Sequence, residues 1–117
     1  MILIRRVYEN QAKDANFKIL VDRIWPRGIA KDVIKIDEWF KEVAPSTALR
    51  KWFNHDPEKW DVFRKKYKVE LAGRADLLSE IKQLERRHKK IALLYAAKDE
   101  KYNNAVALKE VLDATDG

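Results

Sequence analysis

The sequence contains no cysteine and is poor in glycine and proline, with three of each among its 117 residues. Without cysteine there is no disulfide framework, no thiolate metal site and no cysteine nucleophile. No apolar run approaches the roughly 20 residues that a membrane-spanning helix needs. The apolar start, Met1–Ile4, is followed directly by two arginines, which is the wrong order for a secretory signal peptide. We therefore expect a cytoplasmic protein with no membrane partner.

Charge is plentiful, with 25 Lys and Arg against 19 Asp and Glu, a net charge of +6 and an isoelectric point near 9.5. This excess favours anionic partners but says nothing about the fold. Abundant Lys and Glu beside only two Gln weakly indicate a heat-adapted source. The length suits one domain, residues 1–117, around one hydrophobic core.

Three short apolar runs, at 2–7, 17–22 and 91–96, predict β-strands, and a fourth strand is left open. Continuous apolar runs are typical of parallel strands that are covered on both faces. Helical spacing of apolar residues predicts helices at 36–44, 47–53, 56–73 and 76–88, and a last helix from 103 or 104 to about 114. The pattern predicts an α/β fold: a small three-layer sandwich whose mainly parallel sheet, of about three to four strands, is flanked by four to five helices.

The strongest functional signal is the segment 22–28, which follows the second predicted strand. Ligands of parallel sheets bind beyond the carboxyl ends of the strands. Arg23 and Arg27 suit bidentate binding of a phosphate or carboxylate, and Asp22 would orient an arginine. Trp25 would stack on a base or cover the pocket, and Gly28 would permit the turn. The alternative is an Asp22–arginine pair that only staples the loop, with Trp25 buried in the core.

A second polar segment, 96–104, follows the third predicted strand and precedes the last helix. Lys98 adds positive charge, Asp99 would act as a base or an orienting group, and Asn103 lies where helix amides bind anions. The alternative is an ordinary loop with an asparagine cap. If the second and third strands are parallel, both polar segments leave the sheet at the same edge.

Other titratable groups offer further possibilities. His55 beside Asp56 suggests a general base, although Asp56 is also explained as a helix cap. Arg50 would add charge to the anion site. The two histidines, His55 and His88, do not make a zinc site, so we expect no metal.

Two basic runs, 64–68 and 86–90, lie on predicted helices and form the basis of a rival hypothesis of nucleic-acid binding. The alternative is a solvated helix face. No helix-turn-helix, zinc-finger, P-loop, GxGxxG or nucleophile-elbow motif accompanies them, and the sequence identifies no cofactor.

Several blocks resemble the YeaO-like branch of the domain-of-unknown-function family 488, nearly end to end from Ile4 to Leu112. These blocks are Val21–Gly28, Ala44–Ser46, Leu49–Phe53, His55–Pro57, Phe63–Leu71 and Leu94–Ala105. The resemblance implies a small cytoplasmic α/β protein and no particular activity, so it assigns no catalytic residue. Many relatives have Arg at position 98 and His at position 104, and the second difference argues against acid–base chemistry by Asn104.

The leading hypothesis is a pocket for a small anionic molecule, such as a nucleotide or a phosphorylated metabolite. Whether the protein is an enzyme stays open. The expected ligand-binding residues are Arg23, Trp25, Arg27, Gly28, Arg50, Lys98 and Asn103, and the candidate catalytic residues are Asp22, Asp99 and His55. A third hypothesis is an interaction protein whose motifs only hold the fold.

Overall fold

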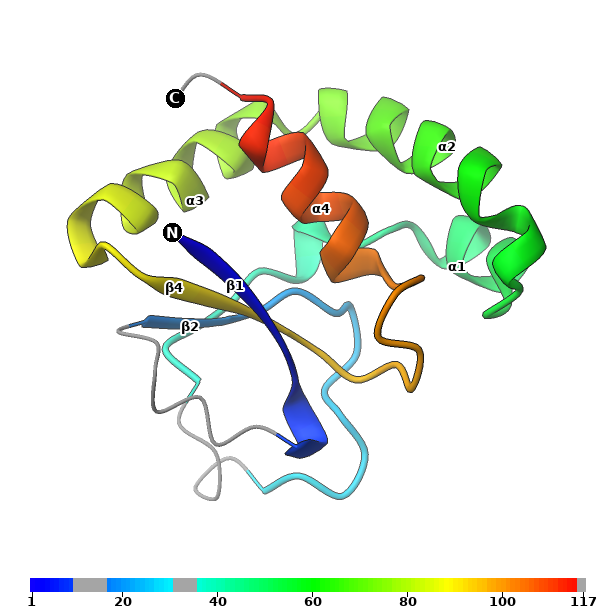
Figure 1. Ribbon diagram of the computed structural model, residues 1–117, viewed down its shortest axis with the longest axis horizontal. Helices are drawn as coiled ribbons and strands as arrows, with labels where there is room; N and C mark the ends of the chain where they lie inside the picture. Colours follow the sequence, from blue (N-terminus) through cyan, green and yellow to red (C-terminus); the bar gives the residue numbers. More distant parts are fainter. Residues whose placement is uncertain (10–16, 31–35, 116–117) are drawn as a thin grey trace.

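A parallel β-sheet lies at the centre of the computed structural model, which describes residues 1–9, 17–30 and 36–115 (Figure 1). Its strands are β1 (Ile2–Arg6), β2 (Phe17–Leu20), β3 (Glu38–Trp39) and β4 (Ile91–Tyr95). Their order across the sheet is β1-β4-β2-β3, and every neighbouring pair is parallel. The carboxyl ends of all four strands therefore point the same way.

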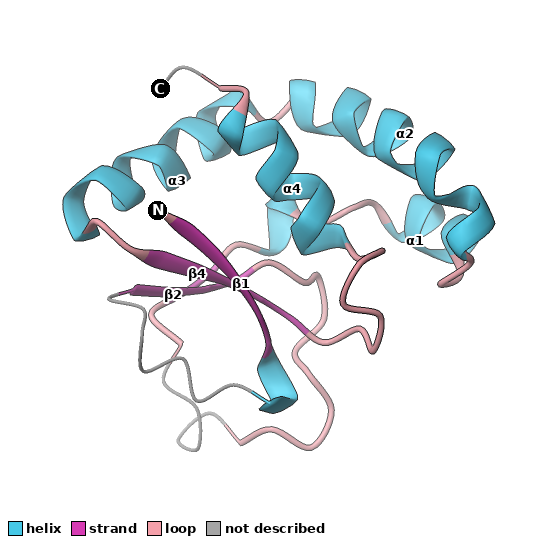
Figure 2. Ribbon diagram, viewed as in Figure 1, coloured by secondary structure: helices cyan, strands magenta, loops and turns pink. Residues whose placement is uncertain are grey.

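Four α-helices and three short 3-10 helices complete the described elements (Figure 2). The α-helices are α1 (Thr47–Phe53), α2 (Trp60–Ala72), α3 (Ala75–His88) and α4 (Asn104–Asp113), and the 3-10 helices are η1 (Val7–Glu9), η2 (Lys41–Val43) and η3 (Pro57–Lys59). The prediction of a small α/β sandwich with a mainly parallel sheet of about three to four strands and four to five helices is confirmed. The predicted third layer is not formed by α-helices in the described part of the chain. None of the helices in the described part of the chain is long and apolar enough to cross a membrane.

The helix predicted at 36–44 is wrong, because this segment forms the edge strand β3 and then η2. The amides of Asp37 and Phe40 donate hydrogen bonds to the carbonyls of Lys18 and Leu20 in β2, at 2.9 and 3.0 Å. Trp39 packs with the cluster on one face of the sheet, and Phe40 packs with the cluster on the other. Apolar spacing alone does not separate this arrangement from a short amphipathic helix.

Three helix starts follow the predicted capping residues. Ser46 Oγ accepts a hydrogen bond from the Leu49 amide at 3.1 Å, and Asp56 Oδ1 accepts one from the Glu58 amide at 3.0 Å. Asn103 caps α4, because its Oδ1 accepts a hydrogen bond from the Val106 amide at 3.0 Å. These caps fix where the loops after β3 and β4 end.

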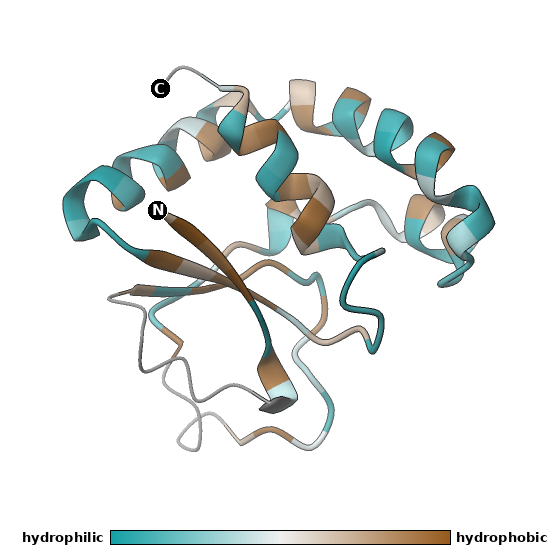
Figure 3. Cartoon of the chain, viewed as in Figure 1, coloured by the Kyte–Doolittle hydropathy of each residue, from teal (hydrophilic) through white to brown (hydrophobic). Residues whose placement is uncertain are grey.

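The two faces of the sheet are covered differently. Ile19, Ile91 and Leu93 belong to the main core, together with residues from all four α-helices. Figure 3 shows hydrophobic stretches on the strands and on parts of the helices. On the other face, Leu20 and Leu94 belong to a smaller cluster that includes no residue of the α-helices. Loop residues, among them Trp25 and Ile36, and the edge residue Trp39 cover that face within the described part of the chain. The loops at the carboxyl edge of the sheet therefore lie between the main core on one face and the smaller cluster on the other.

Candidate ligand-binding cavity

A cavity of about 1000 Å³ lies beyond the carboxyl ends of β1, β2 and β4. Its lining combines residues of the helix-covered core, such as Phe53, with residues of the opposite cluster, such as Trp25. Five cationic side chains and two carboxylates take part: Arg6, Arg23, Arg27, Arg50, Lys98, Asp22 and Asp99. Small-molecule pockets usually enclose about 300–1,000 Å³, so a metabolite-sized ligand fits here.

The structure brings together the two polar segments that follow β2 and β4 (Figure 1). Arg23 and Lys98 line the same cavity, as do all the candidates predicted from the sequence except one. The exception is Gly28, which is not among the lining residues. Its φ of +80° is the left-handed conformation that glycine adopts easily, and a Cβ there would meet no atom within 4 Å. Gly28 therefore shapes the turn of this loop.

Asp22 ties three elements together at the base of the cavity. Its Oδ1 accepts a hydrogen bond from Asn104 Nδ2 at 2.9 Å, and its Oδ2 accepts one from the Ala96 amide at 2.9 Å. Asn104 Nδ2 also donates to the Val21 carbonyl at 3.1 Å. Burial raises the pKa of Asp22, while these hydrogen bonds and the charge of Arg50 act in the opposite direction. Asp22 thus joins the ends of β2 and β4 to the start of α4.

The two arginines of the segment 22–28 have different surroundings. Arg23 is half-buried, and its Nε and Nη2 donate to the carbonyls of Pro45 and Ala44 at 3.2 and 3.1 Å. The side chain of Arg27 is exposed and makes no hydrogen bond or ion pair within the described residues, whereas its backbone carbonyl accepts the Tyr8 hydroxyl at 2.9 Å. Arg23 therefore holds the loop before α1, whereas the charge of Arg27 is available to a ligand.

Trp25 is held between the cavity and the smaller cluster. Its Nε1 donates to the Ile29 carbonyl at 2.7 Å, and its ring packs edge-on against Trp39 with centroids 5.4 Å apart. Trp39 Nε1 in turn donates to the Asp22 carbonyl at 2.7 Å. This pair makes a rigid wall beneath the loop.

The loop after β4 is organised by its own side chains. Asp99 Oδ1 accepts hydrogen bonds from the amides of Tyr102 and Lys101, at 3.0 and 2.8 Å, which lower the pKa of Asp99. Asn103 is buried, with its Nδ2 donating to the Asp99 carbonyl at 2.9 Å and its Oδ1 capping α4. Lys98 is exposed. The polar groups of Asp99 and Asn103 thus build the loop.

His55 lies on an unusual stretch of backbone. It has a φ of 56° and follows Asn54, with a φ of 47°, so two consecutive non-glycine residues adopt the left-handed region. The side chain is exposed at the rim of the cavity, near enough for its charge to act on Asp99. No group of three or more metal-binding side chains occurs among the residues that the structure describes.

Sequence reasoning missed several residues of the cavity. Arg6 Nε donates to the Ala97 carbonyl at 2.9 Å, and its guanidinium lies over the Tyr8 ring, 4.9 Å from the centroid. Tyr102, Phe53 and Phe63 also line the cavity. Arg6 was predictable, because it ends the first strand and the rule applied to β2 and β4 holds there too. Tyr102, Phe53 and Phe63 were not predictable, because nothing in the sequence distinguishes an aromatic residue that lines a cavity from one in the core.

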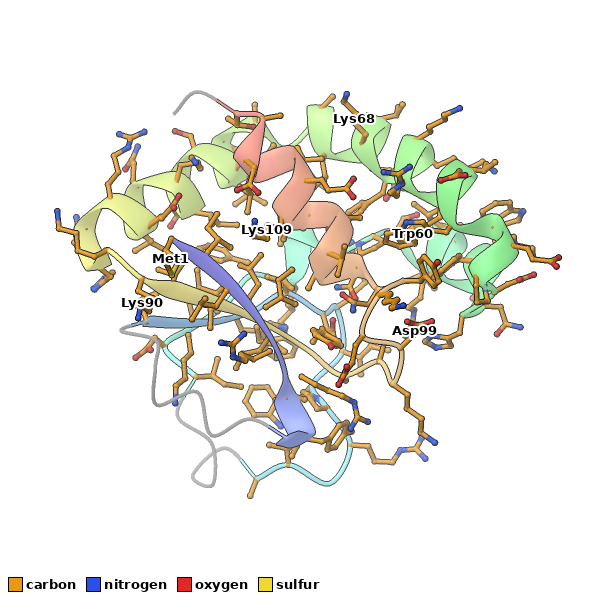
Figure 4. The ribbon with its side chains drawn as sticks, in the orientation of Figure 1. Met1, Trp60, Lys68, Lys90, Asp99 and Lys109 are labelled. Atoms are coloured by element: carbon orange, nitrogen blue, oxygen red, sulfur yellow. The ribbon has the colours of Figure 1, made fainter. Side chains whose placement is uncertain are left out.

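The basic runs lie elsewhere. Arg64 is paired with Asp61 and Glu110, at 2.9 and 3.1 Å. The run 86–90 ends α3 and leads into the amino end of β4, whereas the cavity lies at the carboxyl end. Figure 4 shows Lys90 near Met1 and far from Asp99. The run 86–90 is therefore separate from the cavity.

The fold and the cavity define a small parallel α/β protein with a cation-lined pocket at the carboxyl edge of its sheet. A family model described as "Inactive DUF488-N3 subclade" matches residues 1–116. The uncharacterized protein YeaO of Escherichia coli K12 is 38% identical over 111 residues, which are 95% of this chain and 96% of YeaO. The uncharacterized protein Rv3073c of Mycobacterium tuberculosis H37Rv is 45% identical over 83 residues, 71% of this chain and 70% of that protein. No solved structure matches the chain significantly. The chain belongs to the YeaO-like branch of the DUF488 family.

Proposed function

We propose that this protein binds a small anionic molecule in the cavity at the carboxyl edge of the sheet. The observation behind the proposal is a set of three exposed cations from three elements, Arg27, Arg50 and Lys98. Among the described residues, none of the three side chains makes a hydrogen bond or an ion pair, and Arg50 acts on Asp22 only through its charge.

The surroundings of these three cations favour an anion at this place. Like charges gathered around a concave surface repel one another, and the low-dielectric walls of a cleft concentrate their field. The carboxylates of Asp22 and Asp99 offset only part of this charge and already accept hydrogen bonds from neighbouring groups. A phosphate or carboxylate group would relieve the repulsion and use the bidentate geometry of the two arginines. A nucleotide or a phosphorylated metabolite has this chemistry.

We favour binding over catalysis. Two of the three candidate catalytic residues, Asp22 and Asp99, have structural hydrogen bonds that account for their positions. His55 is then the remaining acid–base candidate at the rim. The description of the matched subclade as inactive supports the same preference.

A thermal-shift screen of phosphate, sugar phosphates and nucleotides tests the proposal, since a ligand of the folded state raises the melting temperature. We expect at least one anion to stabilise the wild type and to lose most of that effect in Arg27→Ala and Lys98→Ala. The matched control is Arg86→Ala, an exposed arginine at the opposite, amino end of the sheet, which should respond like the wild type. If no anion shifts the melting temperature, the proposal fails.

Nucleic-acid binding is a second candidate, favoured by the exposed Arg86, Arg87 and Lys89 around the end of α3. A protein that neutralises several phosphates loses affinity steeply as salt rises. Titration of random DNA and RNA at low and high salt tests this candidate. The double substitution Arg86→Ala and Arg87→Ala should reduce the salt dependence if the candidate is correct.

A further inference from the structure

Two tyrosine rings line the cavity from segments far apart in the chain, Tyr8 after β1 and Tyr102 before α4. Tyr8 is 42% exposed, which is high for a ring at a cavity wall. Each ring packs against a neighbouring side chain: the Arg6 guanidinium lies 4.9 Å from the Tyr8 centroid, and the Trp60 ring lies 5.4 Å from that of Tyr102. Both rings are therefore held in defined orientations.

Each tyrosine is also connected through the backbone to one of the cations whose side chains make no hydrogen bond within the described residues. The Tyr8 hydroxyl donates to the backbone carbonyl of Arg27 at 2.9 Å, which places ring and guanidinium on linked segments. Tyr102 shares a short loop with Lys98, and Asp99 fixes this loop by accepting the Tyr102 amide at 3.0 Å. In the lining of the cavity, each tyrosine therefore lies on a segment that carries a cation or is hydrogen-bonded to the segment that carries one.

The size of the cavity favours a ligand with more than one part. A volume of about 1000 Å³ greatly exceeds what an inorganic phosphate or a short sugar phosphate needs. Base–aromatic stacking is sequence-tolerant and contributes substantially where proteins bind single-stranded nucleic acids, because every base has a π-face. The lining has tyrosine rings for a base and cations for a phosphate.

We propose that the ligand is a nucleoside phosphate. Its base packs on the rings of Tyr8 and Tyr102, and its phosphate is bound by Arg27, Arg50 and Lys98. This inference rests on the proposed function and deepens it, because a sugar phosphate would satisfy the cations and leave the rings unused.

The test is isothermal titration of the full chain with five probes: inorganic phosphate, ribose 5-phosphate, adenosine, adenosine 5′-monophosphate and uridine 5′-monophosphate. We expect at least one nucleotide to bind about tenfold or more tighter than ribose 5-phosphate and than adenosine. If ribose 5-phosphate equals both nucleotides, base recognition is overturned while anion binding stands. If adenosine equals adenosine monophosphate, or no anion binds, the anion site itself is overturned.

Substitutions locate the base. Tyr102→Leu should weaken nucleotide binding about tenfold and leave ribose 5-phosphate binding unchanged, whereas Tyr102→Phe, which keeps the ring, should behave like the wild type. Tyr8→Leu should act like Tyr102→Leu, with a melting curve to establish that the variant folds. A loss of nucleotide and sugar phosphate affinity to the same extent in both leucine variants would overturn the role of the rings.

Discussion

The carboxylate of Asp22 accepts a 2.9 Å hydrogen bond from the side-chain Nδ2 of Asn104, a residue 82 positions later in the chain. Asn104 is the first residue of α4. The other carboxylate oxygen of Asp22 accepts a hydrogen bond from the backbone amide of Ala96, which follows β4. One half-buried carboxylate therefore connects the ends of two strands with the start of the helix beside the cavity.

Asn104→Ala should destabilise the protein by about 1–3 kcal/mol, because Asp22 loses a hydrogen bond that partly offsets its burial. Urea denaturation measures this change. The matched control is Thr47→Ala, an exposed residue at the first position of α1, which should change the free energy of unfolding by less than about 0.5 kcal/mol. Equal effects of the two substitutions would contradict a structural role for the Asp22–Asn104 bond.

Asp22 and Asp99 should make opposite contributions to the pH dependence of stability. Burial raises the pKa of Asp22 above its ordinary 3.8, so the folded state binds this proton more tightly than the unfolded state does. The free energy of unfolding then falls as the pH rises from 3.8 through the folded pKa. Hydrogen bonds lower the pKa of Asp99, whose contribution is present above 3.8 and is lost as the pH falls towards its folded pKa.

Urea denaturation between pH 3 and pH 7 of the wild type, Asp22→Asn and Asp99→Asn separates these effects. Relative to Asp22→Asn, the wild type should lose stability as the pH rises above about 4. Relative to Asp99→Asn, the wild type should gain stability as the pH rises through the region below about 4. If the free energy of unfolding changed with pH in the same way in all three proteins, both pKa shifts, that of Asp22 and that of Asp99, would be refuted.

Arg23→Ala and Arg27→Ala should differ although the residues are only four positions apart. Arg23→Ala leaves the carbonyls of Ala44 and Pro45, both buried residues, without these donors and should cost about 1–3 kcal/mol. Arg27→Ala removes an exposed side chain and should cost less than about 0.5 kcal/mol. Thermal melts of the two variants check this, and unfolding of Arg27→Ala would instead favour an interaction protein whose motifs only hold the fold.

Tyr67→Phe should destabilise the core by about 1–3 kcal/mol without affecting any ligand. The Tyr67 hydroxyl is buried and donates to the Val43 carbonyl at 2.6 Å, so the substitution leaves a buried acceptor without this partner. Burial also raises the pKa of this phenol far above its ordinary value. Tyr102→Phe is the control, because its hydroxyl makes no hydrogen bond within the described residues. Equal denaturation midpoints for the two variants would show that the Tyr67 bond contributes nothing.

Much of the fold was predictable because its signals are local. The apolar runs that became β1, β2 and β4 and the caps Ser46, Asp56 and Asn103 each act within a few residues. The edge strand β3 was not predictable from spacing. Its two residues are extended because the unpaired edge of β2 supplies hydrogen-bond partners, which is a non-local cause.

The sequence by itself determined the parallel sheet, the family and the edge at which polar loops gather. Strand direction follows from the order of strands and helices, and the carboxyl edge follows from strand direction. Only the tertiary structure decided which polar groups are already engaged. Four charged residues of the two polar loops look equally free in the sequence. In the structure, Arg23 binds Ala44, and Asp22 binds Asn104 and Ala96. Asp99 is engaged by the local turn at Tyr102, so Arg27 remains available. A charged side chain is available to a ligand only when folding brings no closer partner to it, and those partners come mostly from distant parts of the chain.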